Sequence, residues 1–325
     1  MQDSLHNFGF TFVRICCILF WVNVAYAEGS FMPRTIGLLS LFVVGKAVNT
    51  ISMKRAQQGK DSLFQRVLFV ELFSAFQAVL LFAFPPYTPL SWAPERLLLP
   101  ILYGTFYIVY MVTMVLALQT GPVSLTSIIC SFTSLIPILA GLLFWGDRLV
   151  VWQVVGLVLF CFSLFLFNSG DYSEAAVRKP VTFRWVVTAL AAMLLGGIAT
   201  TCTRRYCDLY TGYIKEYLLL ANVTTAVLTL PITAYALIRK KGTLTCNRRM
   251  LGYTALGGLA VDMANIVFML YASAFNAAFY FPLISVLGII GVTLATYIFL
   301  HERVSRRALV GIVIAAAALA VLAIS

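Results

Sequence analysis

Long apolar runs follow one another along almost the whole chain and are separated by short polar connections. About 20 consecutive apolar residues are enough to cross a bilayer as a helix. The strict alternation of apolar and polar positions that marks membrane strands is absent, which argues against an outer-membrane barrel. Ten runs have the spanning length, approximately at residues 35–53, 63–84, 97–118, 122–145, 149–168, 184–203, 216–238, 249–271, 275–300 and 304–324. The pattern predicts an all-α polytopic membrane protein with ten transmembrane helices.

The longest polar connection divides these runs into two groups of five. It extends from Asn168 to Thr182. Because five is odd, two homologous halves of five helices each must enter the membrane in opposite senses, which makes them an inverted repeat. We therefore expect a first five-helix repeat at residues 32–168 and a second at residues 182–325.

A short motif recurs at matching places in the two halves. The sequence Gly146-Asp147-Arg148-Leu149 lies between two apolar runs, and Gly156 follows it. The sequence His301-Glu302-Arg303-Val304 has the same kind of flanks, and Gly311 follows at the same offset. The duplication supports an internal repeat, and in transporters built this way the substrate site lies where the halves meet.

Residues 1–31 do not belong to this plan. Phe8 to Ala27 form an eleventh apolar run, which carries Arg14 and ends in small residues, as a secretory signal does. Three interpretations stay open for this signal-like segment: a cleaved signal, an uncleaved extra hydrophobic helix, or an extension upstream of a protein that starts at Met32.

Composition supports the membrane assignment. Hydrophobic residues make up 61% of the 325 residues and charged residues only 11%, with a mean hydropathy of +0.94. The net charge of +11 comes from Lys and Arg in the connections, where such residues fix membrane orientation. We therefore expect the lipid bilayer as partner and no nucleic acid. Connections after the odd-numbered runs carry 15 basic residues and the opposite side carries six, which predicts an outside C-terminus.

Polar and ionisable residues inside the apolar runs are few, and they are the candidates for function. An ionisable side chain at the bilayer centre costs about 2.5–3.5 kcal/mol, so such residues must face the interior of the bundle. Lys46 and Glu71 lie at similar distances from the first connection and reach similar depth in an antiparallel hairpin. Two interpretations stay open: an ion pair that fixes the hairpin, or Lys46 as the anchor for an anionic group of the substrate, with Asn49 beside it.

The eighth run carries Asp262 and, almost one turn away, Asn265. Asp262 has no evident cationic partner in the predicted spans, and a carboxyl group in such surroundings tends to take up a proton. We predict that Asp262 or Glu71 couples transport to protons and that Asn265 contacts substrate. A structural bond from Asp262 to a neighbouring helix is the alternative.

Tyrosines give a second group of candidates. Tyr103, Tyr107 and Tyr110 lie on one face of the third predicted helix. We expect Tyr107 and Tyr110, together with Tyr280 of the ninth run, to line a substrate cavity, since tyrosine combines an apolar ring with a polar hydroxyl. Anchoring at the membrane interface explains Tyr103 equally well.

Known catalytic motifs are absent from the sequence. The chain has two histidines but no His-Glu-x-x-His, no phosphate-binding glycine loop and no nucleophile elbow. The seven cysteines are odd in number and form no Cys-x-x-Cys pair, so neither a disulfide framework nor a metal site is indicated. We expect a protein that is not an enzyme and that has no cofactor.

The duplicated motif resembles the turn between the fourth and fifth helices of each half in the drug/metabolite transporter superfamily, in its EamA-like branch. The stretch from Ala117 to Ser124 also fits the family's entry into the fourth helix. The resemblance implies a ten-helix carrier with a central cavity and alternating access, and a structural role for the turn itself. Members of this size place both termini in the cytoplasm, opposite to the charge count, so orientation stays open.

From this resemblance we expect a secondary transporter of a small polar metabolite, such as an amino acid, with proton coupling as one mechanism. A nucleotide-sugar or sugar-phosphate exchanger is the first alternative, although that class needs several cationic side chains in the cavity. A membrane receptor or membrane enzyme without transport is the second. We expect the plasma membrane, with a bacterial inner membrane preferred because the family is abundant there. A monomer and a homodimer suit the apolar outer faces equally well.

Overall fold

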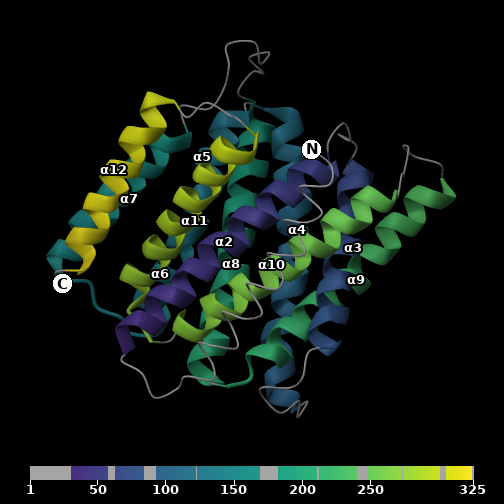
Figure 1. Ribbon diagram of the computed structural model, residues 1–325, viewed down its shortest axis with the longest axis horizontal. Coiled ribbons are helices and arrows are strands. Elements are labelled where there is room, and N and C mark those ends of the chain that lie inside the picture. The colour runs from purple at the N-terminus through teal and green to yellow at the C-terminus, as the bar shows by residue number, and fades with distance from the viewer. Residues whose placement is uncertain are drawn as a thin grey trace.

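The computed structural model describes residues 31–57, 63–83, 93–121, 123–168, 182–210, 212–239, 247–272, 274–300 and 305–323. The expected N-terminal segment, up to residue 30, lies outside these ranges. Every regular element in the described residues is helical (Figure 1). In chain order they are α2 (Phe31–Gln57), α3 (Leu63–Ala83), α4 (Pro94–Thr120), α5 (Val123–Ser131), the 3₁₀ helix η1 (Phe132–Ser134), α6 (Leu135–Phe144), α7 (Val151–Asn168), α8 (Phe183–Leu209), α9 (Ile214–Ile238), α10 (Arg248–Ala272), α11 (Ala277–Leu300) and α12 (Arg306–Ala323).

Eight helical segments in the described residues are long and apolar enough to cross a membrane. One of them, Leu125–Phe144, consists of α5, η1 and α6 together. The apolar parts of α2 and α7, Gly37–Met53 and Val151–Phe167, are shorter. The prediction of an all-α polytopic membrane protein is confirmed, and the count of ten spans stays a prediction.

The break within the fourth apolar run has a local cause. Pro137 lies in the first turn of α6 and has no N–H to donate to the carbonyl of Thr133, four residues earlier. The backbone tightens into a 3₁₀ turn at Phe132–Ser134, which ends three residues before the proline. The hydroxyl of Ser131 donates to the carbonyl of Ser127 at 2.7 Å and caps a carbonyl of the preceding turn. The broken helix presents small polar side chains to the centre of the bundle.

Helix pairs from opposite halves of the chain form the bundle (Figure 1). α2 packs along α10 and α4 along α8, while α3 packs on α9 and α7 on α12 at opposite flanks of the molecule. Close backbone contact is possible because glycines lie at the crossings. A Cβ atom on Gly45 of α2 would lie 2.5 Å from the backbone oxygen of Ala260 of α10, so only glycine permits this approach.

The first copy of the repeated motif forms the turn after α6. Gly146 has a φ of +71°, a left-handed conformation that favours glycine. The backbone N–H of Asp147 donates to the carbonyl of Gly141 at 3.1 Å, which satisfies a group at the end of α6. The motif caps a helix, as the resemblance implied. The second copy, at residues 301–304, lies outside the described residues.

Candidate functional site

A cavity of about 250 Å³ lies at the centre of the bundle, between helices of both halves. We call it the Lys46 cavity. Its lining combines one ammonium group, one amide, several hydroxyls and aromatic faces, which is typical of a site for a small molecule. The lining residues are Phe42, Lys46, Tyr103, Thr133, Ser134, Thr200, Thr203, Tyr217, Leu218, Asn265, Phe268, Met269, Phe281, Ile284 and Ser285.

Lys46 faces α10 from the middle of α2. Its Nζ donates to Oδ1 of Asn265 at 3.5 Å and lies 5.6 Å from the ring centroid of Phe42. No carboxylate of the described residues lies within ion-pair distance of this ammonium. The structure therefore brings together two of the predicted binding residues, which are 219 positions apart in the sequence.

The ion pair between Lys46 and Glu71 is not formed, and that interpretation is wrong. Glu71 instead accepts a hydrogen bond from the hydroxyl of Thr233 on α9. The reason is the packing of the first two helices. α2 packs mainly on α10 and α11, and α3 mainly on α9, so the two side chains point to different neighbours although their depths are similar.

Asp262 is buried beside the cavity but does not line it. Its side chain is 1% exposed, and Oδ1 accepts a hydrogen bond of 2.9 Å from Nε2 of Gln77 on α3. Oδ2 of Asp262 is buried and has no hydrogen-bond partner in the described part of the chain. Asp262 has no ion-pair partner among the described residues. The structural bond to a neighbouring helix thus exists, and coupling to protons stays a prediction.

The three tyrosines of α4 form a row in which Tyr103 and Tyr107 stack with centroids 5.7 Å apart. Tyr107 and Tyr110 follow with centroids 6.1 Å apart. Only Tyr103 lines the Lys46 cavity, whereas Tyr110 lines a second cavity further along α4. The row therefore extends from one cavity to the other, and Tyr107 lies between them.

Two other predicted binding residues do not line the Lys46 cavity. Tyr280 is fully buried, and its hydroxyl donates to the backbone carbonyl of Phe268, so it supports the wall from behind. Asn49 lies nearly one turn beyond Lys46, and its buried Oδ1 has no hydrogen-bond partner in the described part of the chain. These positions differ from the expectation because their helix faces point toward neighbouring helices.

Sequence reasoning missed Thr203 and Tyr217, whose hydroxyls lie 2.8 Å apart in the wall of the cavity. The ring of Tyr217 meets that of Tyr103 edge to face, with centroids 5.8 Å apart. A tyrosine at the start of an apolar run is also typical of an interface anchor, so its sequence position gave no sign of this role.

A buried ion pair joins α4 to α9 near these tyrosines. Nε of Arg96 lies 3.3 Å from Oε1 of Glu216, and the two side chains are 9% and 0% exposed. The guanidinium also lies 3.8 Å from the ring centroid of Tyr213. Arg204 is likewise buried, and its Nε contacts Asp208 at 3.2 Å. The charge count includes Arg96 and Arg204 among the basic residues of the connections, but both lie inside helices, in α4 and α8.

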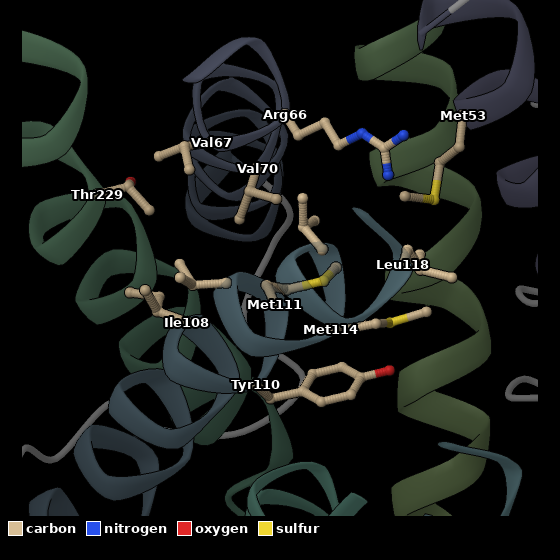
Figure 2. A pocket seen from close by; sticks show the side chains of 12 residues that line it. Met53, Arg66, Val67, Val70, Ile108, Tyr110, Met111, Met114, Leu118 and Thr229 are labelled. Carbon is tan, nitrogen blue, oxygen red and sulfur yellow. The ribbon is translucent and has the colours of Figure 1, made fainter. Parts of the chain in front are cut away.

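The second cavity has a volume of about 240 Å³ and lies between α2, α3, α4 and α9 (Figure 2). We call it the Met cavity. Most of its lining is apolar, and Arg66 carries the only formal charge in it. The lining residues are Met53, Arg66, Val67, Val70, Ile108, Tyr110, Met111, Val112, Met114, Val115, Leu118 and Thr229.

Comparisons with known proteins agree with this architecture. Residues 33–169 match the model of the EamA-like transporter family. A solved crystal structure of a protein with 14% sequence identity has a TM-score of 0.64 and is similar over 88% of this chain and 95% of that chain. At this identity the likeness shows the fold alone. No curated protein matches the sequence of this chain.

Proposed function

Because residues 33–169 match the model of the EamA-like transporter family, part of the drug/metabolite transporter superfamily, we propose that this membrane protein carries a small anionic or zwitterionic metabolite. An amino acid is the solute that fits best, and the plasma membrane is the expected location. The protein moves its solute by alternating access, and the Lys46 cavity is the binding site.

The observation that carries this proposal is the ammonium group of Lys46. It lies at the centre of the bundle, where it contacts an amide oxygen and an aromatic ring. Removing an ammonium from water costs several kcal/mol unless an opposite charge compensates it. A carboxylate of the substrate supplies that charge. Asn265 and the hydroxyls of the wall then orient the polar groups, and the aromatic faces contact the apolar part.

The size of the cavity supports an amino acid over a larger solute. About 250 Å³ holds roughly eight water-sized groups at about 30 Å³ each. A nucleotide sugar is several times larger. Its phosphates also need more cationic side chains than the single Lys46 that lines the cavity. The exchanger alternative therefore has less support from this geometry.

The pairing of the helices supports alternating access between two repeats. We take α2, α3, α4 and α7 of the first half as equivalent to α8, α9, α10 and α12 of the second half. When each helix is exchanged for its equivalent, the contact of α2 with α10 turns into the contact of α8 with α4, and both contacts are present. The same exchange leaves two contacts unchanged, that of α3 with α9 and that of α7 with α12, because the two helices of each pair replace one another. Such an exchange is expected of two halves related by a two-fold axis, which rock against each other around a central site.

Asp262 is the candidate for proton coupling, and Glu71 is the second. The Asp262 carboxyl group lies three residues from Asn265 of the cavity wall, accepts a hydrogen bond from Gln77 and has no ion-pair partner among the described residues. A proton that binds there neutralises a charge next to the site. Glu71 accepts a hydrogen bond from Thr233, which joins α3 to α9.

The first test is ligand binding by thermal unfolding of the purified full chain against a panel of metabolites. A ligand at 100 times its dissociation constant stabilises the folded state by about 2.7 kcal/mol. We expect an amino acid to raise the melting temperature of the wild type and of Arg66→Gln but not of Lys46→Gln. A shift that survives in Lys46→Gln would remove Lys46 from the site. Ligand binding without uptake into proteoliposomes would favour a receptor.

A further inference from the structure

The Met cavity is the strongest feature of the molecule that the transport proposal does not use. α3 and α4 follow one another in the chain, but they barely pack together, because each packs on α9 instead. The Met cavity occupies the wedge between them, with Thr229 of α9 at its back. The tyrosine row of α4 extends from the Lys46 cavity to this cavity.

The lining of the Met cavity combines an apolar body with one basic group at its edge. In Figure 2 the side chain of Arg66 extends from α3 over the cavity toward Met53, above Met111 and Met114. Thioether side chains adapt to ligands of different shape. The hydroxyl of Thr229 donates to backbone carbonyls of its own helix, at 3.0 Å from that of Thr225 and 2.9 Å from that of Ala226. The other polar side chains that line the cavity are Arg66 and Tyr110.

We propose that the Met cavity binds an amphiphile with one anionic head and a short apolar chain. The guanidinium of Arg66 has five N–H donors in a fork that fits a carboxylate or phosphate, so it can hold such a head in addition to another contact. No acidic residue lines the cavity, so nothing in the lining attracts a cation. The volume of about 240 Å³ holds roughly eight groups the size of a water molecule, which is about the number of carbon groups in an alkyl chain of medium length.

The position of Arg66 sets the orientation of this ligand. Arg66 is the fourth residue of α3, near one membrane surface, while Tyr110 lies in the middle of α4. The head therefore binds near the membrane surface, and the chain extends toward the bilayer centre. A free carboxylate from water and a bilayer lipid that inserts an acyl chain between α3 and α4 share this chemistry.

The test is thermal unfolding of the full chain in nanodiscs of zwitterionic lipid with octanoate, and with octan-1-ol as an uncharged probe of equal chain length. We expect octanoate to raise the melting temperature more than octanol does. Arg66→Gln is expected to remove this difference, and Lys46→Gln to retain it. Equal shifts for the two probes, or an octanoate shift that persists in Arg66→Gln, would overturn the proposal. Loss of the shift in Lys46→Gln would also overturn it, because octanoate would then bind in the Lys46 cavity.

A second variant keeps the test decisive if Arg66→Gln folds poorly. Met114→Trp fills the Met cavity and leaves Arg66 in place, so we expect it to abolish the octanoate shift, and a retained shift would contradict the proposal. Nanodiscs with an anionic phospholipid distinguish the two sources. A smaller octanoate shift there indicates that lipid occupies the site, and an unchanged shift indicates a free carboxylate. The proposal does not depend on transport, since every readout is binding.

Discussion

Replacing Glu216 with Gln removes the negative charge of a buried ion pair and keeps almost the same side-chain volume. In the wild type, Oε1 of Glu216 lies 3.3 Å from Nε of Arg96, and the Glu216 side chain is 0% exposed. The pair joins the first turn of α4 to the first turn of α9. Its loss leaves the positive charge of Arg96 in the interior without its counter-charge.

The expected loss of stability follows from this burial. Removing one member of a buried ion pair costs about 3–5 kcal/mol, because the other charge stays in surroundings of low polarity. The Arg96 side chain is 9% exposed and can gain some contact with water when the pair is broken. We therefore expect a loss near the lower end, about 3 kcal/mol in the free energy of unfolding.

The assay is reversible unfolding in mixed detergent micelles, followed by helix content. Glu95→Gln is the matched control, because Glu95 is an exposed acid in the same turn of α4, and its expected effect is within about 0.5 kcal/mol. The double variant Arg96→Met with Glu216→Leu removes both charges and should recover most of the loss. If Glu216→Gln is no more destabilising than Glu95→Gln, or if the double variant is worse than the single one, the reasoning is refuted.

Two further predictions use other contacts. Gly45→Ala places a Cβ atom 2.5 Å from the backbone oxygen of Ala260, so we expect a loss of about 1–3 kcal/mol on unfolding. Gly252→Ala, with open space around its Cβ position, should be neutral or stabilising in the same measurement. Asp262→Asn can keep the contact with Gln77 but cannot ionise, so we expect substrate binding to persist while uptake driven by a pH gradient is lost in proteoliposomes. Unchanged gradient-driven uptake would exclude Asp262 from coupling.

The candidate residues could be found in the sequence, but their partners could not. Lys46, Glu71 and Asp262 stand out because charged residues are rare in apolar runs. The connection between the first two runs suggested that Lys46 meets Glu71, whereas the structure pairs Lys46 with Asn265. The choice depends on which helix faces are in contact, and an antiparallel hairpin in the sequence does not fix that.

The role of residues at the ends of runs was equally hidden. Arg96 and Tyr217 lie where the sequence changes from polar to apolar, and such positions usually belong to the membrane interface. In the structure Arg96 is buried against Glu216, and Tyr217 lines the Lys46 cavity. Their burial results from the helices that cover them, which come from distant parts of the chain.

By itself, the sequence determined that this chain is helical and lies in a membrane, because a bilayer forces each long apolar segment to satisfy its backbone hydrogen bonds within a helix. It also determined the helix-capping turn at Gly146, which depends on local backbone conformation. Only the tertiary structure decided which side chains share a cavity. Packing between helices is set by many weak contacts, such as the crossing at Gly45, and these contacts join residues that are far apart in the sequence.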